Sequence, residues 1–146
     1  MSFVIFREHS DRVVNIYLND TKTMKFDVLS NKIIGCAIEV HKALGPGLLE
    51  SAYEQSLAHE MSLSGILFRL QHPLPVHYKG VRLECGYRVD MLVEDKVVIE
   101  LKSVERINNI HQAQLLTYMK LSKTGIGLLM NFNVLKMKDG IKRMVL

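Results

Sequence analysis

Residues 86–102 read GYRVDMLVEDKVVIELK, and this stretch decides the fold. Two apolar runs flank the polar residues 94–96 (EDK), a pattern that predicts a β-hairpin with a short loop. Because side chains alternate between the two faces of a strand, six apolar residues should share one face and reach a core. With the loop centred on Asp95, they form three facing pairs: Val93–Val97, Met91–Ile99 and Val89–Leu101.

The other face of this hairpin carries the candidate chemistry. It holds four charged and two apolar residues: Arg88, Asp90, Leu92, Val98, Glu100 and Lys102. In this register Asp90 lies opposite Glu100, and two carboxylates at that spacing, roughly 5 Å between Cβ atoms, repel each other. A divalent cation removes the repulsion, and Mg²⁺ prefers oxygen ligands. Since Lys102 lies two residues beyond Glu100, the sequence predicts a metal site with a lysine beside it.

A solvated polar face on an amphipathic hairpin is the structural alternative, because acidic residues and lysines are common on surfaces. Two features argue against it. Leu92 and Val98 share the face with the charges, and residues 97–101 (VVIEL) are nearly all apolar, as in a strand buried on both sides. Glu100 is costly to bury in such a strand unless it is paired or bound to a metal.

Length and composition are those of one ordinary globular domain: 146 residues, 48% hydrophobic and 23% charged. The net charge of +4 permits a polyanionic partner without requiring one. Cys36 and Cys85 are far apart in the chain, so we expect both to be buried and reduced in a cytoplasmic protein. No apolar run approaches membrane-spanning length, and the histidines lack zinc-ligand spacing.

Residues 1–26 form an N-terminal extension of unsettled structure, followed by a domain of residues 27–146. The apolar runs FVIF and VVNIYL in the extension are compatible with a hairpin added to a sheet edge. Alternatively, Met24 is the start of the natural protein and the preceding residues are upstream sequence. Both alternatives stay open at this point.

The rest of the chain predicts an α/β fold, a mixed β-sheet flanked by helices. Ser30 is the expected N-cap of a first helix, which ends at residues 45–47 (GPG). A helix and a buried strand after the hairpin predict a parallel β-α-β unit. The other expected elements are a helix at 48–64, strands at 66–70, 74–78, 81–93 and 97–104, a helix at 108–121, a strand at 125–132, and an edge strand within 136–146.

Several polar residues of the predicted helices have ordinary structural explanations. Glu50 lies in the first turn of the second helix, where a negative charge complements the helix dipole. Tyr53, one turn later, is expected to be a core aromatic residue with its hydroxyl hydrogen-bonded. Gln114 and Tyr118 are spaced i, i+4 and so share one helix face, by default as a surface glutamine and a core tyrosine.

Taken together, these motifs resemble a known group of enzymes. The set Asp90…Glu100-Leu101-Lys102 is similar to the D…(D/E)-x-K motif of the PD-(D/E)XK nuclease superfamily, whose restriction-endonuclease-like core has this element order. Residues 47–53 (GLLESAY) read G-x-x-E-x-x-Y. With IIGCAIEVHKALGPGLLESAYE, HQAQLLTY and GLLMNFN, they resemble the bacterial GxxExxY protein family over residues 24–146.

The resemblance implies a nuclease that uses Mg²⁺, with Mn²⁺ as a substitute, and that cuts nucleic acid, DNA in preference to RNA. Asp90 and Glu100 would bind the metal, joined by Glu50 from the preceding helix. Lys102 would orient the attacking water or stabilise transition-state charge. Gln114 and Tyr118 match the Q-x-x-x-Y of some exonucleases and recombination nucleases of the superfamily.

One residue departs from the superfamily motif, because Val89 stands where the "PD" pair has proline. Basic side chains are available to hold a nucleic-acid backbone: Arg88, Lys120 and Lys142. The rival prediction is a non-catalytic module on the same scaffold that binds nucleic acid or protein. A homodimer or a larger protein partner is compatible with both predictions.

Overall fold

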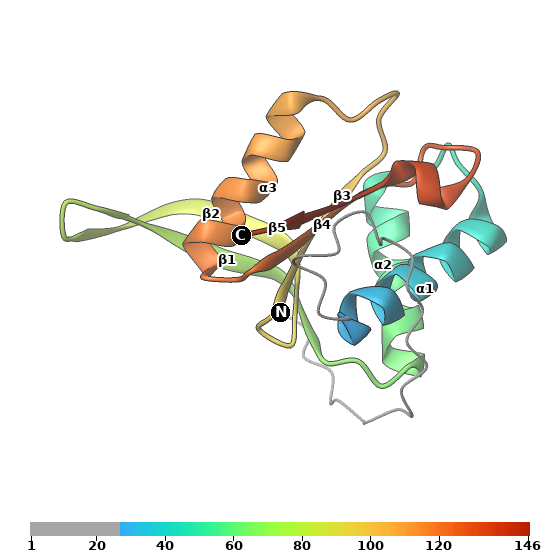
Figure 1. Cartoon of the computed structure of the whole chain (residues 1–146), viewed down its shortest axis with the longest axis horizontal. Helices are drawn as coiled ribbons and strands as arrows, with labels where there is room; N and C mark the ends of the chain where they lie inside the picture. Colours follow the sequence, from blue (N-terminus) through green and yellow to red (C-terminus); the bar gives the residue numbers. More distant parts are fainter. Residues whose placement is uncertain (1–26) are drawn as a thin grey trace.

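The order of helices and strands is the one that the sequence predicts, except that two expected strands form one (Figure 1). The computed structural model describes residues 27–146, and the predictions made for residues 1–26 lie outside this part. The helices are α1 (Val28–Leu44), α2 (Glu50–Leu63) and α3 (Asn109–Ser122), with a short 3-10 helix η1 (Met137–Gly140). The strands are β1 (Phe68–Tyr78), β2 (Val81–Val93), β3 (Val97–Lys102), β4 (Ile126–Asn131) and β5 (Ile141–Val145).

The five strands form one mixed sheet in the order β1-β2-β3-β4-β5. β3 and β4 are parallel and are joined through α3, whereas every other neighbouring pair is antiparallel. The predicted β-α-β unit is therefore confirmed. The predicted C-terminal edge strand is confirmed as β5, which pairs with β4 after the turn of η1.

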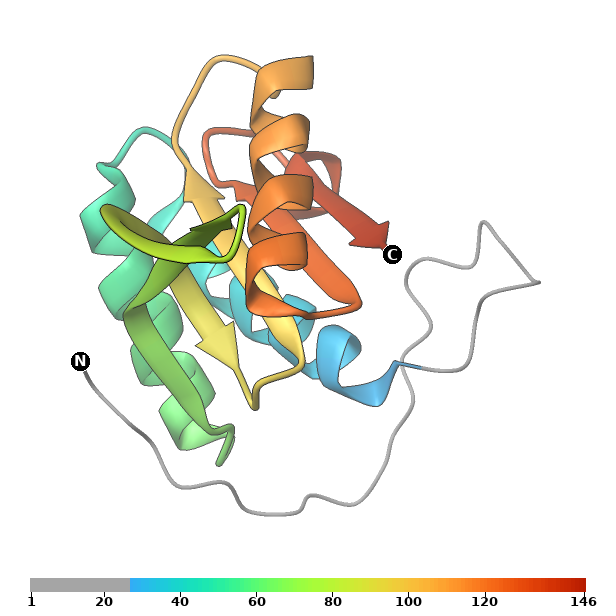
Figure 2. The same cartoon turned by 90° about the vertical axis from the view of Figure 1, so that its left-hand side faces the viewer.

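Helices cover both faces of the central strands (Figures 1 and 2). Helices α1 and α2 pack on one face, where Val97 and Ile99 of β3 point into the larger core. Helix α3 packs on the other face, where Val98 lies against Leu115 and Met119. β3 is thus buried on both sides, as its apolar sequence predicts. None of the helices in residues 27–146 is long and apolar enough to cross a membrane.

The predicted register of the β2–β3 hairpin is confirmed near its turn and fails at its open end. Val93 pairs with Val97 and Met91 with Ile99. Val89 was expected to share their face, but it packs in the core on the α3 side. The reason is local: regular pairing between β2 and β3 stops at Met91 and Ile99. β1 is also irregular at this level, because Gln71 has a φ of 50°.

Two boundaries at the N-terminal side of the fold also differ from the predictions. The N-cap of α1 is Asp27 rather than Ser30, because the Asp27 side chain accepts a hydrogen bond from the Ser30 N–H at 3.2 Å. The two strands expected at 66–70 and 74–78 form one strand, β1. β1 is an edge strand of the sheet, where Pro73 interrupts no ladder on its outer side.

The outer part of the β1–β2 hairpin extends away from the helices (Figure 1). Residues 81–88 of β2 are all exposed. Cys85 lies in this part and is exposed, so the prediction that both cysteines are buried is wrong for Cys85 and confirmed for Cys36. The alternating sequence of β2 gives no sign that its first half lacks a covering layer.

Candidate metal and catalytic site

Asp90 and Glu100 lie across from each other at the point where β2 and β3 separate. The Leu101 N–H donates to Asp90 Oδ2 at 2.8 Å, and the Asp90 N–H donates to Glu100 Oε1 at 3.1 Å. Each carboxylate therefore binds a backbone N–H of the opposite strand, in place of the regular ladder. These reciprocal bonds hold one oxygen of each carboxylate and orient the other oxygen.

Burial and charge both act against ionisation of Glu100, which is only 5% exposed. Burial raises the pKa of its carboxyl from 4.5 to about 8, and the negative charge of Asp90 adds to the rise. The Asp90 N–H and the Lys102 ammonium oppose it. Near neutral pH the pair therefore favours either a proton on Glu100 or a cation beside it.

Lys102 connects this pair to α3. Its Nζ donates to Gln114 Oε1 at 3.4 Å, and Gln114 Nε2 donates to the Tyr118 hydroxyl at 3.1 Å. The i, i+4 spacing thus gives the shared helix face that the sequence predicts. Burial raises the pKa of Tyr118, and the nearby charge of Glu100 raises it further. Asn108 caps α3 with a capping box to His111, which fixes where the helix begins.

The structure brings a different glutamate of α2 toward Asp90 than the one the motif suggests. Glu50 is exposed at the start of α2. Glu54, one turn later, binds Gln71 Nε2 through Oε1 at 3.1 Å and Oε2 at 3.0 Å. The same Nε2 lies 3.4 Å from Asp90 Oδ1. The amide of Gln71 therefore sits between two carboxylates.

The surroundings of Glu54 raise the pKa of its carboxyl group. Burial raises its pKa, the hydrogen bond from Gln71 opposes the rise, and the charges of Asp90 and Glu50 add to it. Sequence reasoning missed both Glu54 and Gln71. The i, i+4 spacing from Glu50 to Glu54 was an available signal, since it places both on one helix face. Gln71 gave no signal, because its position depends on a left-handed backbone within β1.

Tyr53 of the G-x-x-E-x-x-Y motif holds the loop before α2. Its hydroxyl donates to Gly45 O at 2.6 Å and accepts from the Leu48 N–H at 3.1 Å. Its ring stacks on Phe132 with centroids 4.5 Å apart. The predicted core tyrosine with a hydrogen-bonded hydroxyl is confirmed, and it fixes how α2 begins over the sheet.

Two observations test whether these residues fit a divalent cation. Within residues 27–146, no three acidic, histidine or cysteine side chains come together as a metal-binding group. Mg²⁺, however, is commonly held by one or two carboxylates and otherwise by water or substrate phosphate. Asp90 and Glu100 supply two carboxylates whose mutual repulsion a cation would relieve. The pair therefore fits a hard cation.

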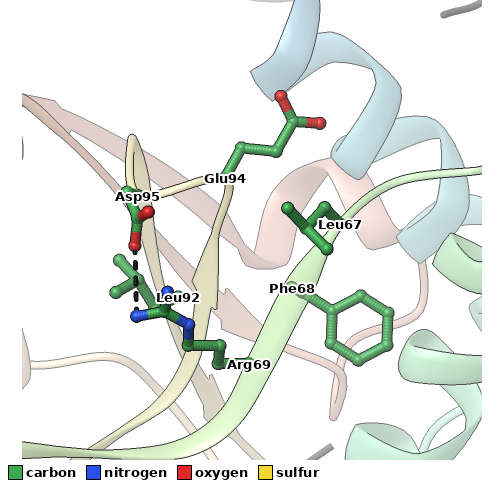
Figure 3. Close-up of a pocket in the computed structure, with 6 residues that line it drawn as sticks. All are labelled: Leu67, Phe68, Arg69, Leu92, Glu94 and Asp95. Carbon is green, nitrogen blue, oxygen red and sulfur yellow. Dashed lines mark ion pairs between the residues drawn. The ribbon is translucent and has the colours of Figure 1, made fainter. Parts of the chain in front are cut away.

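A small pocket lies at the turn of the β2–β3 hairpin, away from this site (Figure 3). Its wall includes Arg69, whose Nη1 lies 3.4 Å from Asp95 Oδ1. Glu94 points away from that ion pair (Figure 3). The remaining lining is Leu67, Phe68 and Leu92. Because its arginine is already paired with Asp95, the pocket is a poor candidate for binding phosphate.

Comparison with known proteins gives one match. A family model described as PD-(D/E)XK nuclease superfamily matches residues 27–144. No curated protein and no solved structure matches the chain. The matched region contains every residue of the candidate site.

Proposed function

The chain belongs to the PD-(D/E)XK nuclease superfamily, and we propose that it is a Mg²⁺-dependent nuclease that hydrolyses phosphodiester bonds in nucleic acid, DNA in preference to RNA. The observation that carries the proposal is a connected set of polar groups from β2, β3 and α3. Its members are Asp90, Glu100, Lys102, Gln114 and Tyr118.

Asp90 and Glu100 would hold the metal ion. Glu54 and Glu50 of α2 would be further carboxylates, and the charges of Asp90 and Glu50 both raise the pKa of Glu54. When bound, such an ion polarises a phosphoryl oxygen and lowers the pKa of a bound water. The chain itself orients the carboxylates, because backbone N–H groups fix one oxygen of Asp90 and one of Glu100. Little reorganisation is then needed when a cation binds.

Lys102 would orient the attacking water and offset the charge that develops on the phosphate. The Gln114 oxygen holds its ammonium group at 3.4 Å. Tyr118 in turn accepts a hydrogen bond from Gln114, which fixes which end of the amide faces the lysine. Gln114 is thus a positioning residue for Lys102, and Tyr118 positions Gln114.

A nuclease assay tests the proposal. Wild type and Lys102→Ala are incubated with Mg²⁺ or Mn²⁺ and with single- and double-stranded DNA and RNA. We expect a loss of about 100-fold or more for Lys102→Ala, the size typical of removing one group that stabilises transition-state charge. The matched control is Lys96→Ala at the exposed hairpin turn, which should cleave like wild type. Equal rates for wild type and Lys102→Ala on all four substrates would refute the enzymatic role.

A non-catalytic module that binds nucleic acid is the second candidate. It is favoured by the observation that no group of three metal ligands is assembled within residues 27–146. Metal titration separates the two. A cation that binds only the folded state raises its stability, so an active site predicts a higher melting temperature in millimolar Mg²⁺, Mn²⁺ or Ca²⁺. If none of the three ions changes the melting temperature, the non-catalytic module is favoured.

A further inference from the structure

The outer part of the β1–β2 hairpin, residues 75–88, is here called the arm. Its outer end projects from the body of the protein, and no helix covers that end (Figure 1). Its tip is a two-residue turn at Lys79 and Gly80, both with positive φ, which joins the paired residues Tyr78 and Val81. The turn lies between the strands that the sequence predicts at 74–78 and 81–93. The arm is therefore a two-stranded ribbon with a register shift at its base and a tight turn at its tip.

The base of the arm continues the face that α3 covers. Alternation places Val76 and Tyr78 on one side of the outer part, and a register shift separates them from Leu74. Leu74 at the base is buried in the core on the α3 side. On β2, Tyr87 pairs with Leu74 at the base, whereas Leu83 and Val81 pair with Val76 and Tyr78 and share their face.

This face leads directly to the candidate site. The ring of Tyr87 lies 6.5 Å from the ring of Tyr118, tilted by 57°. Tyr118 is hydrogen-bonded to Gln114, which binds Lys102. A chain of contacts therefore runs from the proposed catalytic lysine to the first exposed aromatic ring of the arm.

The exposed aromatic rings of the arm need an explanation, because such contiguous apolar surface often marks a binding site. Tyr78 is 59% exposed and Tyr87 is 48% exposed. A cation accompanies the outer ring, since Lys79 Nζ lies 5.4 Å from the centroid of Tyr78. The arm carries three basic residues and one acidic residue, a net charge of +2. Aromatic rings beside positive charge suit a ligand with flat apolar rings and a negative backbone.

We propose that the arm binds a single-stranded segment of nucleic acid, with bases stacked on Tyr87 and Tyr78 and a phosphate against Lys79. The proposal rests on the proposed function, since it gives that site a path for the substrate strand. Stacking requires an unpaired base with a free face, which a duplex does not offer along its length. A second copy of the chain is a weaker occupant, because two arms of net charge +2 repel each other.

The arm supplies its own matched controls on its opposite face. His77 and Arg82 are paired with each other, and alternation along the strands turns them away from the face of Tyr78. Arg82 is also neutralised by Glu84, with Nε 2.7 Å from Oε1. Replacing the side chain of His77 or Arg82 alters the same ribbon but leaves the proposed binding face unchanged.

The test measures binding of a fluorescent single strand of about 12 nucleotides, within the range that such surfaces cover. Divalent metal is left out so that cleavage does not interfere. We expect Tyr87→Ala and Tyr78→Ala each to weaken binding about fivefold or more, the loss of one stacked base. Tyr87→Phe should bind like wild type, because stacking uses the ring and not the hydroxyl. His77→Ala should also bind like wild type.

Salt dependence tests the charged part of the proposal. Lys79→Gln should reduce the slope of log Kd against log salt concentration by about one phosphate contact, whereas Arg82→Gln should leave it unchanged. The duplex of the same sequence should bind more weakly than the single strand. Melting temperatures of all variants identify any that fail to fold. If Tyr87→Ala is one of them, Tyr78→Ala, whose side chain is 59% exposed, carries the comparison with His77→Ala.

The outcomes separate this proposal from the nuclease itself. If the protein cleaves but Tyr87→Ala and Tyr78→Ala bind and cleave like wild type, the arm proposal is wrong and the nuclease stands. If the protein does not cleave but these two alanine variants lose binding, the arm proposal stands and the nuclease is wrong. Equal binding of duplex and single strand, or tyrosine variants that alter oligomeric state instead of binding, would also overturn the proposal.

Discussion

The two ends of the β2–β3 hairpin differ in how they use the backbone. Near the turn, Met91 pairs with Ile99 in a regular ladder, and both side chains are fully buried. One residue further from the turn, Asp90 and Glu100 accept the hydrogen bonds that a ladder would make. The same two strands thus serve packing at one end and orient carboxylates at the other.

The difference shows how a sheet can present charge without losing hydrogen bonds. Backbone N–H groups that leave the ladder still have acceptors, so no buried donor is orphaned at Asp90 or Leu101. What remains costly is the charge itself, because Glu100 is buried beside another carboxylate. The stability contributed by the turn end, Met91 and Ile99, should therefore depend on apolar volume. The stability contributed by the open end, Asp90 and Glu100, should depend on pH and metal.

The largest effect is expected from removing the buried charge at the open end. The pKa of Glu100 is about 8 in the folded protein and 4.5 by reference, so between these values the folded state binds more protons. Stability of the wild type should therefore fall as pH rises from about 5 to about 9. One pKa unit is worth about 1.4 kcal/mol, which sets an upper limit of roughly 5 kcal/mol. Glu100→Gln should flatten this decline.

Urea unfolding at several pH values, without divalent metal, measures this prediction. Glu105→Gln is the control, because Glu105 is exposed beyond the end of β3 and should keep the decline of the wild type. A Glu100→Gln curve that falls with pH as steeply as the wild-type curve would contradict the buried-charge account.

The turn end should respond to volume alone. Ile99→Ala removes a fully buried side chain from the larger core and should cost about 2–5 kcal/mol at any pH between 5 and 9. Lys96→Ala, in the exposed turn of the same hairpin, should change stability by less than about 0.5 kcal/mol. Urea unfolding at both pH limits checks both variants. A cost for Ile99→Ala that changes strongly with pH would mean that the two ends are not independent.

Metal should act at the open end and compete with the proton. Mg²⁺ at about 100 times its Kd should raise the free energy of unfolding by about 3 kcal/mol. The apparent Kd should be lower at pH 9 than at pH 6, because Glu100 with a pKa of about 8 must lose its proton to bind the cation. Thermal unfolding across a Mg²⁺ titration at both pH values measures this. Asp90→Asn should abolish the gain, and Asp139→Asn, at an exposed position of η1, should retain it.

Sequence patterns predicted the regular end of the hairpin and only part of the open end. The two-residue period and the polar loop were enough to set Met91 opposite Ile99, because a slip of one residue would turn the apolar side chains to the wrong face. Helical spacing also predicted that Gln114 and Tyr118 share one helix face, because i, i+4 spacing is a local property. Local periodicity is what these successes share.

The misses depend on contacts between distant segments. Val89 packs on the α3 side where β2 leaves the ladder, which no local pattern reveals. Glu54 meets Gln71 across 17 positions of sequence, and the contact requires the left-handed φ of Gln71. Exposure of Cys85 follows from the lack of a helix over the arm. These features are set by how elements are placed, not by the residues within one element.

The smallest effect is expected at Gln71, whose amide lies where Glu54 and Asp90 approach each other. Gln71→Asn keeps an amide and tolerates positive φ, but its shorter side chain cannot reach both carboxylates. Without metal, we expect a loss of about 1 kcal/mol, the value of one hydrogen bond. With saturating Mg²⁺ the loss should shrink, because a cation replaces the amide as the positive partner of Asp90. Gln55→Asn, exposed on α2, is the control. Urea unfolding with and without Mg²⁺ measures the loss of unfolding free energy in Gln71→Asn. An equal loss in both conditions would mean that the Gln71 amide and the cation occupy different places. Glu54 would then no longer be a proposed metal ligand.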